Sequence, residues 1–548
     1  SGSGYHAFYT NGSNERLRVT NTGEVRVPDS GKFTVGNDDD LQIYYDSVTG
    51  DSFIKETGSG NLKLVTSTFR LRNAADSEHI IWANQDAEVR LYHDSSLKFE
   101  TTSTGAKVTG ALEVTQEYPS IRPTLDLNFA ATKTLDRRIT FTRDSLGTYV
   151  DDMGIIKYAS NNTPRFDHDP ATGESLGLLI EEARTNQMIY SSDITNNGSQ
   201  NTSYGVQNGT VTGDQTTAPD GTTTADKYAA NSTNSIHRVD LFFTSGQITN
   251  STAYTFSVFV KANGYDKLHL RYGGYNADNH GLGYDLSDGT TFAGRFDGTG
   301  LIGGVTSSSM IAYPNGWYRC SFTFTTAADA ASSAAGMFYY ISNSEATTNF
   351  AGDGSSGMYF WGAQMEVGDF PTSYIPTSGS TVTRAADIAK ITGTNFSDFY
   401  NQTEGTVFSS HQQYSGQSDA QNTYVYQISN ATSSSVAFRL LDKNNYYSNP
   451  ARLTATQWSN DVALQKPDVT NGERIRTAFA CKVNDAAVSY DGATVLTDNS
   501  LDMNSGQIEM SIGGFTQSPQ AFLNGHIQQI SYYPKRLPNA QLQGLTQQ

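Results

Sequence analysis

The sequence has few cysteines and no long hydrophobic run. Only two cysteines, Cys320 and Cys481, occur in 548 residues, which excludes a scaffold held together by disulfides and predicts two buried free thiols in different domains. No apolar segment approaches the roughly 20 residues that cross a bilayer, and the first residues have neither the basic nor the apolar part of a signal peptide. We therefore expect a protein that needs no disulfides and does not insert into a membrane.

Positive charge is also scarce. The chain carries 37 Lys and Arg against 55 Asp and Glu, a formal net charge of −18. Nucleic acids and anionic membrane surfaces are bound by clustered Lys and Arg side chains. Neither is expected as a partner.

Glycine and aromatic residues, by contrast, are abundant. The chain has 50 Gly, 31 Tyr and 27 Phe, with Ser, Thr, Asn and Asp spread along its length. This composition is typical of many short strands joined by turns, and the aromatics supply core residues that a disordered chain lacks. The sequence predicts an all-β protein.

One six-residue strand pattern occurs twice near the start of the chain, and we call it the repeated phrase. "LQIYYD" (41–46) and "VRLYHD" (89–94) are each followed by a polar run punctuated by glycine. Residues 1–117 alternate apolar and polar positions throughout, as strands do. Units with so little apolar surface must stack on neighbouring units or on other chains, so the pattern predicts a repetitive β shaft. The alternative is a small self-contained sandwich whose two phrases are alike by chance.

Three further segments follow the shaft. Residues 118–190, with prolines, turns and a helix-like piece at 175–184, predict an ordered connector or collar. About eight regularly spaced strand patterns in 191–377 predict an antiparallel β-sandwich of jelly-roll type. Residues 378–548 predict a second sandwich that ends in a short helix at 538–546.

Several segments resemble bacteriophage proteins. Residues 41–46 and 89–114 are similar to repeats in tail-fibre and virion structural proteins of marine phages, and 125–186 resembles a segment of phage fibres. That segment typically precedes a carbohydrate-binding-module-like jelly roll that ends as residues 359–387 do. Residues 521–546 resemble the last strands and helix of concanavalin A-like and laminin-G-like lectin sandwiches.

The resemblance covers most of the chain and implies a function. It implies a homotrimeric phage tail fibre, located on the virion after synthesis in the host cytoplasm. Its partners would be other tail or baseplate proteins and a glycan of the host cell surface, which the distal sandwiches would contact. A bacterial surface adhesin is a weaker alternative.

Two segments rich in aromatic and amide side chains are candidates for binding that glycan. Sugars are held by aromatic faces against their CH groups and by planar polar side chains at their hydroxyls. Residues 270–285 and 442–450 combine both kinds of side chain. The alternatives are a loop packed at a subunit interface and an ordinary exposed turn. The candidates are Tyr272, Tyr275, Asn276, Asn279, His280 and Tyr284 in the first segment, and Asn444, Asn445, Tyr446, Tyr447 and the nearby Trp458 for the second.

Other motifs favour structural roles. Trp317 and Trp361 sit in strand patterns and are expected in a core. Calcium takes about six to eight oxygens from several segments, so the acidic turns 36–41 and 165–170 are expected to be solvated. Jelly rolls of the resembled type often hold a structural calcium, for which Glu182 and Glu366 are weak candidates; no other cofactor is expected.

Signals of catalysis are missing from the sequence. It contains no GxSxG, HExxH or P-loop motif, and we predict a binding protein, not an enzyme. Two alternatives stay open. A glycan-degrading tailspike would need two carboxylates about 5–10 Å apart, and a purely structural or decoration fibre would bury its loop aromatics between chains.

Overall fold

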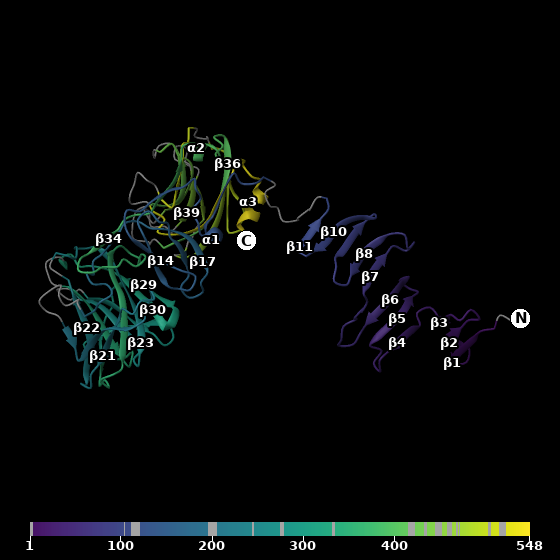
Figure 1. The fold of residues 1–548 in the computed structure, drawn as a ribbon, viewed down its shortest axis with the longest axis horizontal. Helices are drawn as coiled ribbons and strands as arrows, with labels where there is room; N and C mark the ends of the chain where they lie inside the picture. The colour runs from purple at the N-terminus through teal and green to yellow at the C-terminus, as the bar shows by residue number, and fades with distance from the viewer. Residues whose placement is uncertain are drawn as a thin grey trace. The chain divides into compact units, whose positions relative to one another are not determined.

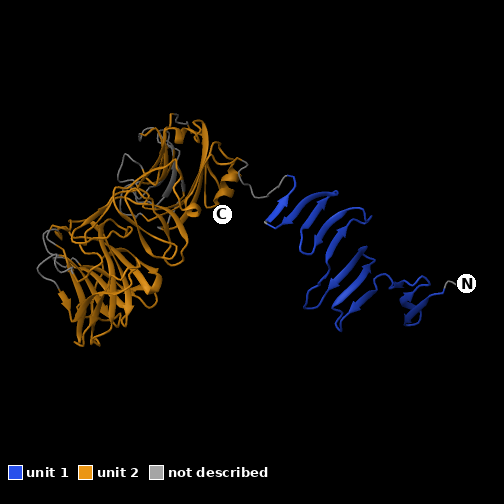
Figure 2. Cartoon of the chain, viewed as in Figure 1, with its two compact units in different colours: residues 1–115 blue, residues 116–548 orange. Residues whose placement is uncertain are grey.

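The chain forms two compact units, residues 1–115 and 116–548 (Figure 2). Their named strands pair antiparallel in several sheets, which confirms the predicted all-β class (Figure 1). No helix in the described part of the chain is long and apolar enough to cross a membrane. The computed structural model describes residues 4–103, 105–110, 121–195, 205–243, 246–273, 279–330, 335–414, 422–431, 436–443, 452–456, 463–466, 470, 472–501, 506–514 and 522–547.

The first unit consists of three small sheets joined by turns. Two have three strands and one has five, and each is a meander in which consecutive strands pair. The strands are β1 (His6–Thr10), β2 (Asn14–Val19) and β3 (Val25–Arg26); β4 (Lys32–Val35), β5 (Leu41–Asp46) and β6 (Asp51–Glu56); and β7 (Thr68–Arg72), β8 (His79–Asn84), β9 (Val89–His93), β10 (Ser96–Thr102) and β11 (Gly105–Val108).

The repeated phrase places the same kind of side chain at the same place in two sheets. Ile43 of the first phrase lies opposite Phe33 on one side and Ile54 on the other. Leu91 of the second phrase lies opposite Ile81. Directly opposed residues point to the same face of a sheet. Phe33, Ile43 and Ile54, which we call the apolar row, therefore line one face of their sheet.

This unit has no core within a single chain. None of the described residues 4–103 and 105–110 is buried. In the apolar row, Phe33 is 56%, Ile43 45% and Ile54 62% exposed. A self-contained sandwich would bury these side chains, so the apolar faces of this unit lack a covering layer.

The jelly roll in residues 205–377 packs two sheets face to face. Their facing side chains form one core that includes Phe256, Leu270 and Met358. The first sheet contains β19 (Gly205–Gln207), β22 (Ser235–Phe242), β31 (Gly336–Ser342), β24 (Lys267–Gly273), β25 (Asn279–Asp285), β26 (Thr290–Phe292) and, beside β22, β32 (Asn349–Phe350). The second contains β20 (Gly209–Thr216), β21 (Ala225–Ala230), β33 (Gly357–Val367), β23 (Ala253–Asn263), β30 (Trp317–Thr325) and β29 (Val305–Tyr313), and β27 (Arg295–Phe296) pairs with β28 (Gly300–Leu301).

The core positions predicted for the tryptophans are confirmed. Trp317 and Trp361 are each 2% exposed, and their indole N–H groups donate to Thr217 and Thr224. Cys320 is buried in the jelly roll and Cys481 in the second sandwich, both as free thiols, as predicted.

The second sandwich also packs two sheets, around a core that includes Val407, Tyr426 and Ile530. One contains β16 (Phe166–His168), β17 (Ser175–Ile180), β45 (Gly525–Tyr533), β36 (Glu404–Gln413), β41 (Arg474–Lys482), β42 (Asp485–Tyr490), β43 (Leu496–Asp498) and, beside β45, β12 (Leu125–Asn128). The other contains β13 (Thr140–Thr142), β35 (Ile388–Thr392), β44 (Glu509–Ile512), β37 (Asn422–Ser429), β38 (Val436–Lys443), β39 (Arg452–Thr456) and β40 (Ala463–Lys466).

Short elements complete this unit. The terminal helix α3 is where the sequence predicts it, within 538–546. Two two-stranded ribbons are β14 (Gly147–Val150) with β15 (Ile156–Ala159) and β18 (Arg184–Asn186) with β34 (Val382–Arg384). The helices are α1 (Phe129–Thr132), α2 (Thr394–Ser397) and α3 (Asn539–Thr546), and Pro314–Gly316 forms a 3₁₀ turn.

The segment 118–190 takes part in the second sandwich instead of standing apart as a collar. Strands β12 and β17 both pair with β45, and β13 pairs with β35. The jelly roll is thus inserted between two stretches of chain that build one sandwich. This insertion holds the two sandwiches together at both ends of the jelly roll.

The helix predicted at 175–184 is wrong, because Ser175–Ile180 is strand β17. Leu178 and Ile180 belong to the core of the second sandwich, whereas Leu179 lines a pocket on the other side of the strand. A strand covered on both faces has a continuous apolar run, which periodicity alone cannot distinguish from a buried helix.

The interior of the second sandwich contains a histidine that makes it sensitive to acid. His411 of β36 is fully buried, and neither ring nitrogen has a hydrogen-bond partner among the described residues. Burial, with a smaller contribution from Lys466, lowers the pKa of His411 to about 3. The unfolded chain holds this imidazole at a pKa of about 6.5. Below that pH the unfolded state binds more protons, so stability falls as the pH falls.

We expect the free energy of unfolding to drop by about 2 kcal/mol more between pH 7 and pH 5 in the wild type than in His411→Leu. Leucine keeps most of the side-chain volume and removes the titrating group. Denaturant titrations of both proteins at the two pH values measure the difference. Equal losses would show that His411 does not carry this pH dependence.

Candidate functional site

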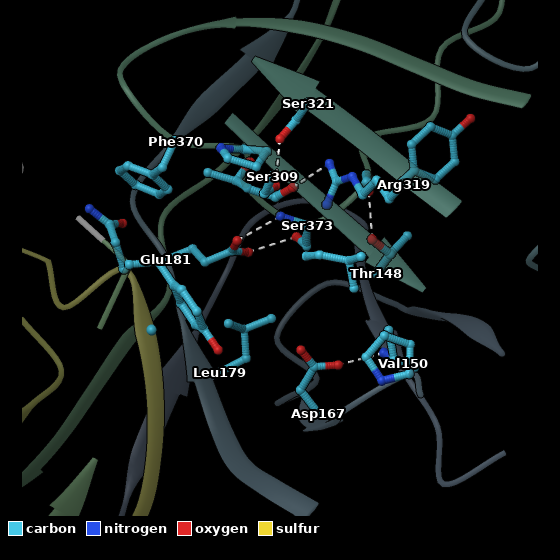
Figure 3. A pocket seen from close by; sticks show the side chains of 18 of the residues that line it. Thr148, Val150, Asp167, Leu179, Glu181, Ser309, Arg319, Ser321, Phe370 and Ser373 are labelled. Atoms are coloured by element: carbon cyan, nitrogen blue, oxygen red, sulfur yellow. Dashed lines mark hydrogen bonds between the residues drawn. The ribbon is translucent and has the colours of Figure 1, made fainter. Parts of the chain in front are cut away.

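A pocket lies where the jelly roll meets the second sandwich (Figure 3). Its volume is about 450 Å³, which suits a small ligand such as one or two sugar rings. We call it the junction pocket. It is lined by residues that include Thr148, Val150, Asp167, His168, Leu179, Glu181, Phe259, Ser307, Ser309, Ile311, Tyr313, Arg319, Ser321, Thr323, Phe370, Ser373, Tyr374, Tyr414 and His526.

One wall of the junction pocket carries hydroxyl groups. The antiparallel register places Ser309 of β29 opposite Ser321 of β30, and their hydroxyls are 2.6 Å apart. Ser307 and Thr323 both donate to the backbone carbonyl of Asp369. Strand β29 is the edge strand of its sheet, so this row of hydroxyls faces the pocket without a further strand beside it.

A second wall is apolar and rigid. Phe259 and Tyr374 line the pocket, and both pack on the buried Trp361, with ring centroids 5.4 and 4.5 Å from it. Phe370 also lines the pocket, and the guanidinium of Arg184 lies 4.9 Å from its ring centroid. Aromatic and aliphatic surface next to a row of hydroxyls fits a ligand with one apolar and one polar side.

Two histidines line the pocket and are held in place by neighbouring groups. Asp167 accepts from the backbone N–H of Val150 and lies 2.8 Å from Nε2 of His526. His168 is fixed through Nδ1, which lies 3.0 Å from the carbonyl of Val150. Nε2 of His168 and Nδ1 of His526 have no hydrogen-bond partner among the described residues. Both nitrogens are buried, so the two histidines shape this side of the pocket through Asp167 and the Val150 carbonyl.

The base of the pocket is fixed by buried charges. Glu181 accepts hydrogen bonds from the backbone N–H and the hydroxyl of Ser373, at 2.7 and 2.6 Å, and pairs with Arg165 at 2.7 Å. Burial opposes ionisation of Glu181, but Arg384 and Arg165 outweigh it and hold the pKa of this carboxyl well below its ordinary value. Glu181 therefore stays ionised and positions Ser373 rather than acting as a proton donor.

The calcium candidates are engaged by protein groups. Glu182 pairs with Arg184 at 2.6 Å and accepts from Asn524 at 3.1 Å. Glu366 is fully buried and accepts from Gln364 and from the N–H and hydroxyl of Thr372. In the described part of the chain, no group of three or more His, Cys, Asp and Glu side chains is placed to hold a metal ion.

The glycan candidates at 270–285 do not form a surface cluster. Tyr272 and Tyr284 are fully buried in the jelly-roll core, where Tyr272 stacks on Phe324 and Tyr284 donates to the carbonyl of Ser321. Neither side chain can reach a ligand, because successive residues of a strand face opposite sides and these two face inward. Asn279 accepts from Arg271, and Nδ1 of His280 lies 2.9 Å from the carbonyl of Gly304.

The other glycan candidates lie outside the described residues, and their role stays a prediction. They are Tyr275, Asn276, Asn444, Asn445, Tyr446, Tyr447 and Trp458.

Sequence reasoning missed the junction pocket as a site. It singled out the turn 165–170, but expected that turn to be solvated. The pocket brings Asp167, Ser309 and His526 together from three distant segments. The one local signal is the run of serines at 307–309, which is unusual for an edge strand.

Comparison of the sequence with protein-family models and with curated proteins finds no match. Among solved structures, the NanB sialidase from Streptococcus pneumoniae aligns at 12% identity and a TM-score of 0.22, over 27% of this chain and 25% of the sialidase. A protein of Bacteroides ovatus named for carbohydrate binding aligns at 10% identity and a TM-score of 0.22. The alignment covers 54% of this chain and 80% of that protein. Domains LG4-5 of the mouse laminin alpha1 chain align at 11% identity and a TM-score of 0.15. The alignment covers 55% of this chain and 86% of the laminin domains.

These three structures contain β-sandwich domains, as this chain does. This chain spans about a quarter of the length of the sialidase. Because the TM-scores are low, we draw no conclusion about function from the likeness.

Proposed function

We propose that this chain is the subunit of a homotrimeric phage tail fibre that binds a glycan on the host cell surface without cleaving it. The observation that carries the proposal is the contrast between the two units. None of the described residues of the first unit is buried, whereas the second unit has two complete sandwich cores and a pocket. The first unit needs other copies of the chain to cover its apolar faces, whereas the second unit is complete in itself. This combination is the organisation of a fibrous adhesin.

The junction pocket supports glycan as the ligand. Its hydroxyl row and its aromatic wall match the polar and apolar faces of a sugar ring. Three copies in one fibre would raise the avidity of a weak site without new contacts at any one site. The net charge of −18 would limit non-specific adhesion to anionic surfaces.

The test is binding of the full chain to host cells and to polysaccharide extracted from them, with an assay for reducing ends on the same samples. Saturable binding without release of reducing ends supports the proposal. Release of reducing ends would favour the tailspike, and no binding by a folded assembly would favour a purely structural fibre.

Ser309→Trp is expected to weaken glycan binding by about tenfold or more while the protein stays folded. Ser309 is half-buried on an edge strand, so the indole enters the pocket without displacing a neighbouring strand and occupies the space of the ligand. Ala312→Trp is the matched control, because Ala312 is exposed on the same strand and does not line the pocket. Equal affinities of the two variants would exclude the junction pocket as the binding site.

A further inference from the structure

A second pocket lies on the outer face of the sheet that contains β45, β36 and β41. Antiparallel register places Ser410 of β36 opposite Gln529 of β45 and Arg476 of β41, so the three side chains share one face. Helix α3 covers the neighbouring part of this face, where Phe408 and Tyr533 pack against Leu542 and Leu545. The face beyond the helix is open, and we call this hollow the outer-face pocket; its volume is about 520 Å³.

The lining of the outer-face pocket is basic in an acidic protein. Three arginines, Arg122, Arg474 and Arg476, line it against one carboxylate, Glu174. The chain as a whole has a net charge of −18. The charge of the pocket lining therefore has the opposite sign to the net charge of the chain.

Two of these arginines make no ion pair with the residues that the structure describes. Arg474 pairs with Glu174. The guanidinium groups of Arg122 and Arg476 have no ion pair or hydrogen bond to any residue in the described part of the chain.

The nearby carboxylates are already engaged. Asp491 accepts from the backbone N–H of Arg476 and pairs with Lys466 at 3.4 Å. Asp126 accepts from the side chains of Gln529 and Ser531. Among the described carboxylates, none is therefore paired with Arg122 or Arg476, and we expect both guanidinium groups to meet an incoming anion.

The other polar lining groups are partly engaged. Ser410 donates to Gln528 at 3.3 Å, and both side chains are buried, as is Tyr533. The half-buried Asn128 adds an amide group whose oxygen accepts from the backbone N–H of Ala131. A guanidinium binds a carboxylate or sulfate through two parallel hydrogen bonds.

We propose that the outer-face pocket binds an acidic sugar residue of a glycan, with Arg476 and Arg122 holding its carboxylate or sulfate group. The proposal deepens the proposed function by naming the charge class of the glycan. It uses residues that are separate from the junction pocket. An adhesin with this site selects acidic over neutral polysaccharides despite its own negative charge.

The test measures binding of the full chain to polygalacturonate, to dextran sulfate and to neutral dextran, at low and at physiological salt. We expect saturable binding to one or both acidic polymers and none to neutral dextran. Arg476→Gln is expected to weaken binding to the acidic polymer about tenfold, and Arg122→Gln with Arg476→Gln to weaken it further. Arg476→Lys keeps the charge but loses the paired hydrogen bonds, so it is expected to recover part of the affinity.

The control variant is Arg137→Gln. Arg137 is exposed, lies in the same unit and does not line the pocket, so its loss changes net charge equally and is expected to leave affinity unchanged. Competition by free galacturonate or by inorganic sulfate identifies which anion the arginines hold. Either result supports the proposal when the competitor displaces the polymer from the wild type and Arg476→Gln weakens the binding of that competitor.

Three outcomes would overturn the proposal. The first is no binding to either acidic polymer, and the second is an equal loss of affinity in Arg137→Gln and Arg476→Gln. The third is a changed oligomeric mass of Arg476→Gln with unchanged polymer binding, which would make the pocket a contact between chains. None of them affects the proposed function, which Ser309→Trp and host polysaccharide test independently.

Discussion

Asp387→Ala is expected to lower the free energy of unfolding of the second unit by about 3–5 kcal/mol. Asp387 is the centre of a buried charge cluster, which we define as Asp387, Glu181, Arg143, Arg165 and Arg384. Its carboxylate pairs with Arg143 at 3.1 Å and with Arg165, and accepts from the backbone N–H of Glu181 at 3.0 Å. The side chains of Asp387, Arg143 and Arg165 are fully buried.

Removing the carboxylate leaves three buried cations and one anion. Burial already lowers the pKa of Arg143 and of Arg384, against the opposing effect of the carboxylates. Water cannot replace the lost partner without opening the structure, so the full cost of an unpaired buried charge falls on the folded state.

Urea titration followed by tryptophan fluorescence measures the effect. Asp398→Ala is the control, because Asp398 is exposed and makes no ion pair among the described residues, and we expect it to stay within about 0.5 kcal/mol of the wild type. A loss below about 1 kcal/mol in Asp387→Ala would show that the cluster is hydrated or dispensable.

The charge cluster also connects stability to the site. Arg165 donates to the carbonyl of Thr148 and to the hydroxyl of Ser373, and both residues line the junction pocket. One member of the buried charge cluster therefore also fixes two residues of the junction pocket. We expect Asp387→Ala to lose glycan binding as well as stability.

Much of the fold follows from local patterns in the sequence. Alternation in "LQIYYD" predicts a strand, and the terminal helix at 538–546 follows from its own composition. The apolar run at 175–180 misled the prediction, because only the tertiary structure shows that both faces of β17 are covered. Pairing with β45 joins residues more than 400 positions apart for β12 and about 350 positions apart for β17, and no local pattern encodes such a pairing.

The candidate site was harder to predict for a related physical reason. Tyr272 and Tyr284 have the composition expected of a sugar site, but their positions in the strand face them into the core. Aromatic content indicates that a segment has large side chains, not which face they occupy. Asp167 and His526 meet only because the sandwich closes, so neither residue carries a local signal of its partner.

Ile43→Asp is expected to dissociate the fibre into single chains of 59.5 kDa. Ile43 is the middle member of the apolar row. In the proposed trimer this row is covered by other copies, and an aspartate there buries an unpaired charge at a cost of several kcal/mol per copy. Three copies multiply that cost, so the effect on assembly is large even though the fold of a single chain is unchanged.

Mass measurement in solution distinguishes the outcomes. We expect the wild type to have three times the mass of one chain, Ile43→Asp the mass of one chain, and Thr34→Asp the wild-type mass. Thr34 lies next to Phe33 on the same strand and is exposed on the opposite face of the sheet, so it adds the same charge outside the apolar row. If Ile43→Asp has the mass of the wild type, other contacts hold the chains together. If the wild type has the mass of a single chain, the proposed fibre is contradicted, because nothing would then bury the apolar faces of the first unit.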